Sequence, residues 1–305
     1  MSRTGWLLLV GTLVSGCAGR GPSEQEFDGA AAFGYIDTQL SFGPRVPNTE
    51  GHRRAGDWIL ERLRGTADSV EEQAFEHVTV DGDTVRLRNL IGRFRPDVAD
   101  RILYMAHWDT RPVADRAANL AEQRQPVPGA NDGGSGVALL LGVADALALT
   151  PPQFGVDLVF VDGEDYGDFS DPELRDVLIG ARYYANNLDE GAPLPLFAVV
   201  WDMVADRDLR IPQESYSLAN APEVVQRVWG TARDLGYRRV FVAEAGGGIT
   251  DDHVPLQQVG IRAIDVIDLD YGPNRAYWHT LQDVIENVSA ESLQIVGDVA
   301  MALLR

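Results

Sequence analysis

Short apolar runs alternate with longer helical stretches through most of this chain, and this alternation limits the folds that it can adopt. Runs of strand length lie at residues 85–94, 101–106, 156–161, 196–201 and 262–267. Helical stretches lie at residues 51–63, 136–149, 176–188, 221–235 and 290–304. Strands that alternate with helices are typical of a sheet covered on both faces. The sequence therefore predicts an α/β three-layer sandwich, with helices on both faces of a mostly parallel, mixed central β-sheet.

An antiparallel pair is expected at the start of this sheet. Residues 72–80 and 84–94 both have strand character, and only Asp81, Gly82 and Asp83 separate them. A connection this short joins antiparallel neighbours. No repeat and no second linker follows, so we expect one domain over residues 29–305.

The beginning of the chain has a different pattern. A short positive start precedes an apolar run at residues 6–14, and small residues then lead to Cys17, the one cysteine of the chain. This is the three-part layout of a secretory signal, and its end resembles the bacterial lipobox. The run is too short to span a bilayer, which needs about 20 residues. We expect a lipoprotein signal peptide over residues 1–16, lipidation of Cys17 and a polar tether over residues 17–28.

Such a protein would be exported and anchored in a membrane, on its periplasmic or cell-surface side. Its composition restricts its partners, because 46 acidic residues stand against 26 basic ones and the formal net charge is −20. An acidic body repels phosphate groups, so nucleic acid is excluded as a partner. A single cysteine also excludes an intrachain disulfide framework.

Polar residues follow directly after three of the apolar runs. His107 and Asp109 follow the first of them, Glu164 and Asp165 the second, and Asp202 the third. In open α/β sheets, ligands bind outside the carboxyl ends of the strands. We therefore expect these three segments to meet at one rim of the sheet.

Two further segments are expected at the same rim. The stretch 129–136 is rich in glycine, which allows the sharp turn that would aim Asp132 at the rim. It has neither the lysine of a P-loop nor the spacing of a dinucleotide fingerprint, so phosphate binding is disfavoured. His279 lies beyond the last apolar run, next to Trp278.

Together these segments supply a set of metal donors without cysteine, formed by His107, Asp132, Asp165, Asp202 and His279. Singly, each has an ordinary explanation as a helix cap, a turn former or a half-buried histidine. As a group they suit zinc, and a cation would relieve the repulsion among clustered carboxylates. Adjacent residues of an extended segment point in opposite directions, so one of Glu164 and Asp165 would bind metal while the other faces the substrate as a general acid/base.

The motifs resemble those of the zinc aminopeptidase clan, and most closely its bacterial-type glutaminyl cyclase (glutaminyl-peptide cyclotransferase) branch. The ordered blocks that resemble this family are residues 41–52, 107–112, 129–133, 163–167, 201–204, 249–253 and 277–280. They span nearly the whole chain after the tether. The resemblance implies a zinc-exopeptidase-like fold.

The resemblance also implies a zinc site and a reaction. One zinc ion would be held by Asp132, Asp165 and His279. The substrates would be peptides or proteins with an N-terminal glutamine, which the enzyme converts to pyroglutamate with release of ammonia. Zinc would polarise the γ-amide, and Glu164 would move a proton from the α-amine to the departing ammonia.

Three more residues have roles that the resemblance implies. Asp202 and Asp251 would form a hydrogen-bonded acid network with Glu164, and Trp278 would wall the pocket beside the zinc. The presence of Asp251 and Trp278 favours the cyclase branch.

Two other functions stay open on the sequence. In a zinc aminopeptidase with two metals, Asp132 would bridge the ions, and His107 with Asp202 would complete the second site. His107 could instead lie outside the metal's direct ligands, held by Asp109. A non-catalytic lipoprotein that retains the fold is the third hypothesis, because fold alone does not fix function.

Overall fold

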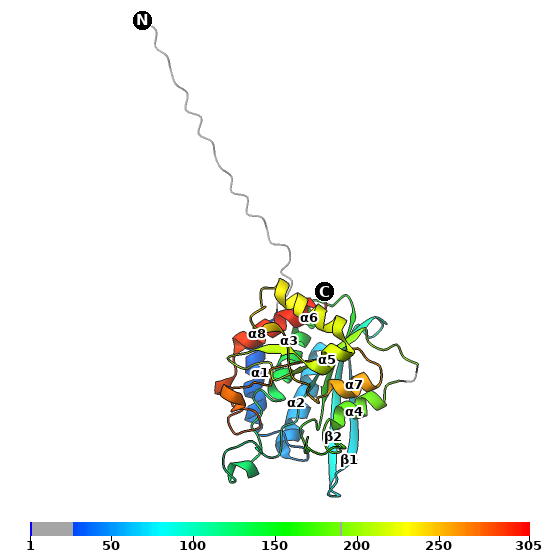
Figure 1. The fold of residues 1–305 in the computed structure, drawn as a ribbon. Coiled ribbons are helices and arrows are strands. Elements are labelled where there is room, and N and C mark those ends of the chain that lie inside the picture. Colours follow the sequence, from blue (N-terminus) through cyan, green and yellow to red (C-terminus); the bar gives the residue numbers. More distant parts are fainter. Residues whose placement is uncertain (2–26, 190) are drawn as a thin grey trace.

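A computed structural model gives the fold of the chain, and residues 1, 27–189 and 191–305 are described. A six-stranded sheet with the order β1-β2-β4-β3-β5-β8 runs through its centre (Figure 1). Its strands are β1 (Ser69–Val78), β2 (Thr84–Phe94), β3 (Arg101–His107), β4 (Gly155–Val161), β5 (Phe197–Asp202) and β8 (Ala263–Ile267). The four strands from β4 to β8 in this order are parallel, and β2 is antiparallel to both β1 and β4. The mixed, mostly parallel sheet is thus confirmed.

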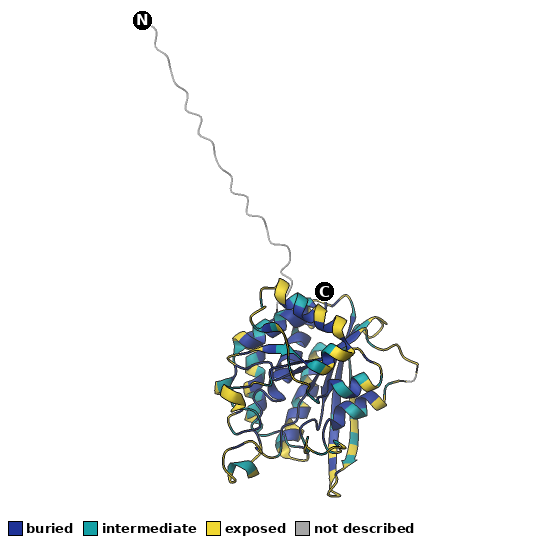
Figure 2. Cartoon of the chain, viewed as in Figure 1, coloured by how far each residue is buried: buried dark blue, intermediate teal, exposed yellow. Residues whose placement is uncertain are grey.

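Helices cover both faces of the sheet, as the sequence predicts. One layer consists of α1 (Gly29–Ser41), α2 (Glu50–Thr66), α3 (Gly134–Leu149) and α8 (Ala290–Ala302). The other consists of α4 (Ile179–Asn186) and α7 (His253–Gln258). Two more helices, α5 (Ser215–Asn220) and α6 (Pro222–Asp234), pack beside the edge strand β8. Figure 2 shows the central strands buried between the helices, whereas the residues of the edge strand β1 are intermediate or exposed.

Alternation along the strands divides the core between the two faces. In β3, Tyr104 packs with the cluster under α3 and α8, whereas its neighbour Met105 packs with the cluster under α4 and α7. In β2, Leu90 and Ile91 divide in the same way. This period of two is the pattern that a sheet covered on both faces requires.

Helix α3 lies at the centre of its layer and is apolar on nearly every side. It contacts α1, α2 and α8 as well as the sheet. A helix surrounded in this way must be hydrophobic all round, and this explains the long run of alanine, leucine and valine that it contains. The position of α3 matters for function because its first turn begins at the rim of the sheet.

Several elements differ from those that the sequence predicts. The predicted helix over residues 176–188 is shorter, since α4 begins only at Ile179. Leu178 has a left-handed backbone (φ 53°), and its N–H donates to the carbonyl oxygen of Glu164 at 3.0 Å. The sequence analysis also missed α1, α5, α7 and the small parallel pair β6 (Ile211–Gln213) and β7 (Phe241–Ala245).

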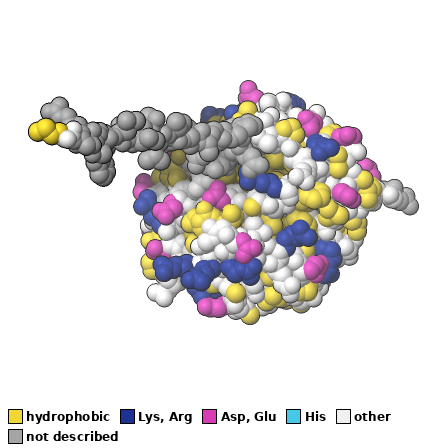
Figure 3. All heavy atoms as spheres, turned by 90° about the horizontal axis from the view of Figure 1, so that it is seen from above, with side chains coloured by type: hydrophobic (Ala, Val, Ile, Leu, Met, Phe, Trp, Pro, Cys, Tyr) yellow, Lys and Arg dark blue, Asp and Glu magenta, His cyan; other side chains and the backbone are white. Residues whose placement is uncertain are grey.

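Positive and negative side chains lie side by side on the described surface. On the face drawn in Figure 3, arginine and acidic side chains are interspersed. None of the described helices is both long enough and apolar enough to cross a bilayer. All of the predicted signal peptide except Met1, the lipidation site Cys17 and nearly all of the predicted tether lie outside the described residues.

Candidate metal centre and active site

Three parallel strands deliver the candidate residues to one edge of the sheet. His107 is the last residue of β3, and Asp202 is the last residue of β5. Glu164 and Asp165 follow β4, which lies on the other side of β3 from β5. The convergence of these three segments at one rim, predicted from the sequence, is confirmed.

Asp132 reaches the same rim through the glycine-rich turn before α3. Gly133 has a positive φ of 72°, and a Cβ there would lie 2.7 Å from the carbonyl oxygen of Asp109. Only glycine fits such a position. The carboxylate of Asp283 accepts the N–H of Asn131 at 2.8 Å and that of Asp132 at 3.2 Å. This turn therefore has a fixed conformation, and it presents Asp132 to the rim.

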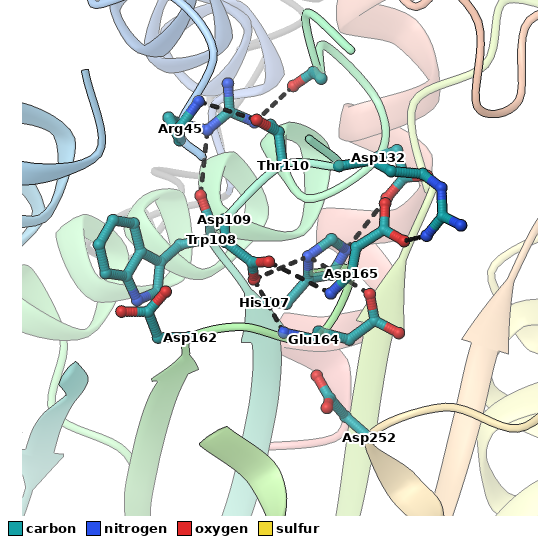
Figure 4. Close-up of polar contacts among 12 residues, drawn as sticks. Arg45, His107, Trp108, Asp109, Thr110, Asp132, Asp162, Glu164, Asp165 and Asp252 are labelled. Atoms are coloured by element: carbon teal, nitrogen blue, oxygen red, sulfur yellow. Dashed lines mark hydrogen bonds and ion pairs between the residues drawn. The ribbon is translucent and has the colours of Figure 1, made fainter. Parts of the chain in front are cut away.

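Arg45 braces the loops around this turn (Figure 4). Its side chain donates to the carbonyl oxygens of Trp108 at 3.0 Å and Gly129 at 2.6 Å, and its backbone N–H donates to the Thr110 hydroxyl at 2.8 Å. Burial lowers the pKa of Arg45 to about 10. One buried guanidinium thus joins the segment after β3 to the glycine-rich turn.

One set of donors consists of Asp132, Asp165 and His279. One ligand atom from each lies within 4.8 Å of the other two, and all three residues are buried. His279 Nε2 is 3.7 Å from an oxygen of Asp132 and 3.6 Å from an oxygen of Asp165. One histidine and two carboxylates leave a position open for water or substrate on a tetrahedral zinc ion. His279 also has a left-handed backbone (φ 55°), a strained conformation typical of functional positions.

A second set shares Asp132 and adds His107 and Asp202. His107 Nε2 lies 3.2 Å from an oxygen of each of these carboxylates, so this set already has close contacts among its own members. The other ring nitrogen, Nδ1, is buried without a hydrogen-bond partner, 3.5 Å from Asp109. Burial opposes the charged form of His107, but the surrounding carboxylates, first that of Glu164, raise its pKa well above the usual value.

The electrostatics of the rim fit a cation. Burial raises the pKa of Asp165 to about 6 and that of Asp202 to about 7. Such shifts mean that these carboxylates are costly to ionise without positive charge nearby. A dication among them would offset this cost, and the histidine and carboxylate donors are those that zinc accepts. The residues present therefore fit a zinc site.

Glu164 lies beside these donors without belonging to either set. Burial raises its pKa well above the usual value; His107 opposes this, and Asp165 and Asp251 reinforce it. Figure 4 shows its carboxylate between His107 and Asp252, whereas the carboxylate of Asp165 lies on the Asp132 side.

The prediction that Glu164 and Asp165 point to opposite sides of an extended segment is only partly right. Both side chains line one cavity, because β4 ends at Val161 and Gly163 turns the chain with a φ of 71°. Asp109 fixes this turn, since its carboxylate accepts the N–H groups of Glu164 at 3.1 Å and Asp165 at 3.2 Å. Asp109 belongs to neither donor set.

The cavity at the rim is small, with a volume of about 70 Å³. One side consists of the acids Asp132, Glu164, Asp165, Asp202 and Asp251 together with His279. The other is mostly apolar and includes Phe169, Ile249, Ile267, Leu269 and Trp278. Asp251 and Trp278 both line this cavity beside the donors. The predicted hydrogen-bonded network of Asp202 and Asp251 with Glu164 is not formed among the described residues: Oδ1 of Asp251 accepts the N–H of Asp252, its Oδ2 has no hydrogen-bond partner, and Asp202 contacts His107.

Three residues at the site have no assigned role in the sequence analysis. Asp252 is fully buried, and neither carboxylate oxygen has a hydrogen-bond partner. Arg111 donates to Asp165 at 2.5 Å, and Asp115 contacts His279 at 3.2 Å. Arg111 and Asp252 lie inside sequence blocks that resemble the family, so the resemblance is a signal by which both could be found as candidate site residues. Nothing in the sequence distinguishes Asp115 from any other loop aspartate.

Known proteins share this fold and these segments. A Zn-dependent exopeptidase from Parabacteroides distasonis is 34% identical with a TM-score of 0.87, and the match covers 93% of this chain and all of that one. Glutaminyl cyclase from Porphyromonas gingivalis is 37% identical with a TM-score of 0.86, over 91% of this chain and 98% of that one.

The curated relatives extend the comparison to aminopeptidases. Aminopeptidase YwaD of Bacillus subtilis is 23% identical over 91% of this chain, which spans only 57% of the length of that enzyme. The sequence profile described as "Peptidase family M28" matches residues 89–304, which include every donor of the rim. This chain therefore belongs to Peptidase family M28.

Proposed function

We propose that this protein is a zinc-dependent glutaminyl-peptide cyclotransferase. The observation that supports it best is the placement of Glu164, a buried acid with a raised pKa, in a small cavity between the metal donors and an apolar wall. At about 70 Å³ the cavity is far below the roughly 300–1,000 Å³ of common ligand pockets. It suits one short side chain, such as that of an N-terminal glutamine.

The zinc site of this proposal consists of Asp132, Asp165 and His279. When bound there, zinc supplies Lewis-acid polarisation of the substrate's γ-amide carbonyl. The similarity to a Zn-dependent exopeptidase supports zinc as the metal.

Glu164 would move the proton of the reaction. Its carboxylate accepts a proton from the α-amine as the amine nitrogen attacks the γ-carbonyl carbon. It then gives this proton to the amide nitrogen, the bond from that nitrogen to the amide carbonyl carbon breaks, and ammonia leaves. A carboxyl whose pKa lies well above its usual value suits both steps near neutral pH.

The acids around Glu164 support this role. Asp251 and Asp252 both disfavour the ionised form of Glu164. Asp251 lines the cavity, and Asp252 lies below Glu164 in Figure 4. The cluster therefore favours a proton on Glu164 at the moment when the leaving ammonia needs one.

The apolar wall suits the side chain that cyclisation requires. Phe169, Ile249 and Trp278 line the cavity beside the acids, where they can pack against the aliphatic part of a glutamine side chain. Cyclisation needs no water, because the nucleophile is the substrate's own amine, already held close to the amide carbonyl carbon. A hydrolase must bind a water molecule as the nucleophile.

A zinc aminopeptidase is the second candidate, and one observation favours it. The set formed by His107, Asp132 and Asp202 could hold a second metal, with Asp132 as the bridge. Glu164 would then activate a water molecule. The similarity to aminopeptidase YwaD supports this alternative.

One assay separates these functions. Metal-loaded protein is incubated with a glutaminyl arylamide, and the products are identified. Pyroglutamyl arylamide with ammonia is expected, and free arylamine would instead indicate the peptidase. Neither product would indicate a protein that retains the fold without catalysis. Metal analysis gives an independent check, since one zinc per chain is expected of the cyclase and two of the peptidase.

We also propose that the protein is exported and anchored through Cys17. The support is the layout of the first 17 residues, with an apolar run and small residues ahead of this cysteine. Substrates would then be peptides or proteins outside the cytoplasm. Mass spectrometry of the mature N-terminus is expected to find a lipidated Cys17, and an unmodified Cys17 would contradict the proposal.

A further inference from the structure

The segment from Arg111 to Arg116 contacts the candidate zinc site from outside. Arg111 is buried, and its guanidinium Nη1 donates to Asp165 at 2.5 Å. The Nε of the same guanidinium donates to Asp115 at 2.7 Å, and its Nη2 donates to the other oxygen of Asp115 at 3.3 Å. One planar cation thus joins a zinc donor to an acid that lies outside both donor sets.

Asp115 continues this chain of contacts to a second zinc donor. Its Oδ1, which accepts from Arg111, lies 3.2 Å from Nδ1 of His279. This leaves Nε2 of His279 as the ring nitrogen on the side of Asp132 and Asp165. A carboxylate on the far nitrogen of a metal-binding histidine fixes the ring and raises its basicity.

Arg116 adds two contacts to the same histidine segment. Its backbone N–H donates to the carbonyl oxygen of His279 at 3.2 Å. Its guanidinium lies over the ring of Trp278, 5.0 Å from the ring centre. These contacts restrain the backbone at His279, where the left-handed conformation needs support from its surroundings.

The segment has its own anchor in the fold. Ala114 packs in a small apolar cluster with Ala117, Val127 and Leu281. The N–H of Val127 donates to the carbonyl oxygen of Arg111 at 3.0 Å. The position of the segment is therefore set by this packing and by this backbone hydrogen bond, neither of which involves the zinc donors.

We propose that Arg111 and Asp115 are positioning residues that act as one clamp, holding Asp165 and His279 in place for the same zinc ion. The proposal rests on the zinc site of the proposed function and is independent of whether the reaction is cyclisation or hydrolysis. The planar fork of Arg111 is essential to it, because the guanidinium must reach two carboxylates at fixed angles. A lysine ammonium has the same charge but cannot span both acids in this geometry.

The test compares zinc affinity in variants of the full protein. Each protein is stripped with a chelator, and the zinc dissociation constant is measured by competition with a chromogenic chelator. Arg111→Lys and Asp115→Ala should each weaken zinc binding by about 10- to 100-fold, as losses of such partners do. Asp115→Asn should lose less than Asp115→Ala, because an amide oxygen still accepts a hydrogen bond from Nδ1 of His279.

The ion pair of Arg101 and Asp157 provides matched controls. Arg101 donates to Asp157 from Nε at 2.9 Å and from Nη2 at 2.5 Å, at the end of β3 opposite His107. Arg101→Lys and Asp157→Ala should leave the zinc dissociation constant within about twofold of the wild type, as expected of distant substitutions. Melting temperatures with and without zinc separate the clamp from a structural role, since the clamp predicts a smaller zinc-induced rise in the Arg111 and Asp115 variants.

The outcomes are distinct. If wild-type protein binds zinc and both Arg111→Lys and Asp115→Ala bind it equally well, the clamp is overturned and the proposed function is not. If the wild type binds no zinc, the site assignment fails and the clamp fails with it. If Arg111→Lys does not fold, Asp115→Ala decides alone, because Asp115 is half-exposed and its removal leaves the core intact.

Discussion

Glu164 and Asp165 are adjacent acids with different surroundings. The backbone turns at Gly163, and the N–H groups of both acids are held by Asp109. Asp165 then lies against Arg111 among the zinc donors, whereas Glu164 lies near His107 and the acids Asp251 and Asp252. A neighbouring cation stabilises a carboxylate as a ligand, and neighbouring acids favour a proton on it. The pair can therefore divide metal binding and proton transfer between them.

Substituting these residues should separate the two tasks. Glu164→Gln is expected to lower turnover by about 10²- to 10⁴-fold, the usual contribution of general acid–base catalysis, while zinc stays bound. His279→Ala should lose zinc as well as activity. The measurements are steady-state rates and the zinc content after gel filtration. Full activity of Glu164→Gln would show that another group moves the proton.

The lowered pKa of Glu214 predicts that the free energy of unfolding depends on pH. This buried carboxylate accepts the N–H groups of Tyr216, Ser217 and Ile249 and so caps α5 and holds the loop before α7. Burial raises its pKa, but the contact with His253 and these hydrogen bonds outweigh burial and lower the pKa from 4.5 to about 2. A lowered folded pKa means that the charged carboxylate stabilises the fold above pH 4.5, and that this stability is lost as the pH falls towards 2.

The measurement for Glu214 is denaturant unfolding of wild type and Glu214→Gln. At pH 7 the variant should be less stable by about 1 to 2 kcal/mol, as for loss of a helix cap. The difference should shrink as the pH falls from 4.5 towards 2, where the wild-type carboxyl also takes up its proton. A difference that does not change with pH would contradict the assignment of this stability to the charge.

Residues that follow strands could be predicted from the sequence, and residues that depend on loop geometry could not. His107 and Asp202 end strands, so the strand pattern alone places them at the rim. Asp115 lies in a loop, and its contact with His279 joins residues 164 positions apart. No local pattern encodes such a distance, because it depends on how the whole sheet brings two loops together.

At the scale of elements, the entry to α3 links the fold to the site. The helix begins at Gly134, one residue after a glycine with a positive φ and two after Asp132. The helix itself is fixed by packing on all sides. A change in the backbone conformation of this turn therefore cannot be absorbed by a shift of the helix. Such a change must displace Asp132.

A pair of glycine substitutions tests this coupling. Gly133→Ala and Gly82→Ala both place a side chain at a positive φ, which costs about 1 to 3 kcal/mol. Only Gly133 also has a backbone oxygen within 2.7 Å of the new Cβ, whereas Gly82 has open space. We expect Gly82→Ala to lose stability alone and Gly133→Ala to lose zinc affinity as well. Equal zinc affinity in the two variants would contradict the coupling.

The start of α4 shows what the apolar spacing of the sequence does not predict. Residues 176–188 have apolar spacing, yet the chain is helical only from Ile179 because Leu178 and Gly180 bond back to the segment after β4. The N–H of Gly180 donates to the carbonyl oxygen of Asp162 at 2.8 Å. Tertiary hydrogen bonds of this kind override local propensity. The strands were predicted more closely, since burial on both faces gives them continuous apolar runs.

At the scale of the whole molecule, the acidic composition divides into two groups. Most acids lie on the surface among arginines, as Figure 3 shows for one face. A smaller group is buried around the rim, where burial raises the pKa of several members. The net charge of −20 predicted exclusion of phosphate-bearing partners, but the composition alone could not show which acids turn inward.

Removal of zinc should therefore destabilise the entire fold. At free zinc of about 1,000 times its dissociation constant, binding adds about 4 kcal/mol to the free energy of unfolding. For a domain of this size, a chelator should then lower the melting temperature by roughly 8 to 16 °C. The check is thermal unfolding with and without chelator, with the His279→Ala variant as the control that should not respond. Equal melting temperatures for the wild type would contradict a structural contribution from zinc.

Phe27 packs the first segment of the domain against the helical layer. The ring fits against Gly142 in α3 and Gly297 in α8. Gly142 lies eight residues beyond the start of α3, about 12 Å along its axis from the rim. The described chain therefore joins the domain on the flank of the helical layer, about two helical turns from the rim. Under the proposed anchoring through Cys17, the domain would be attached at this flank and not at the rim that holds the metal donors.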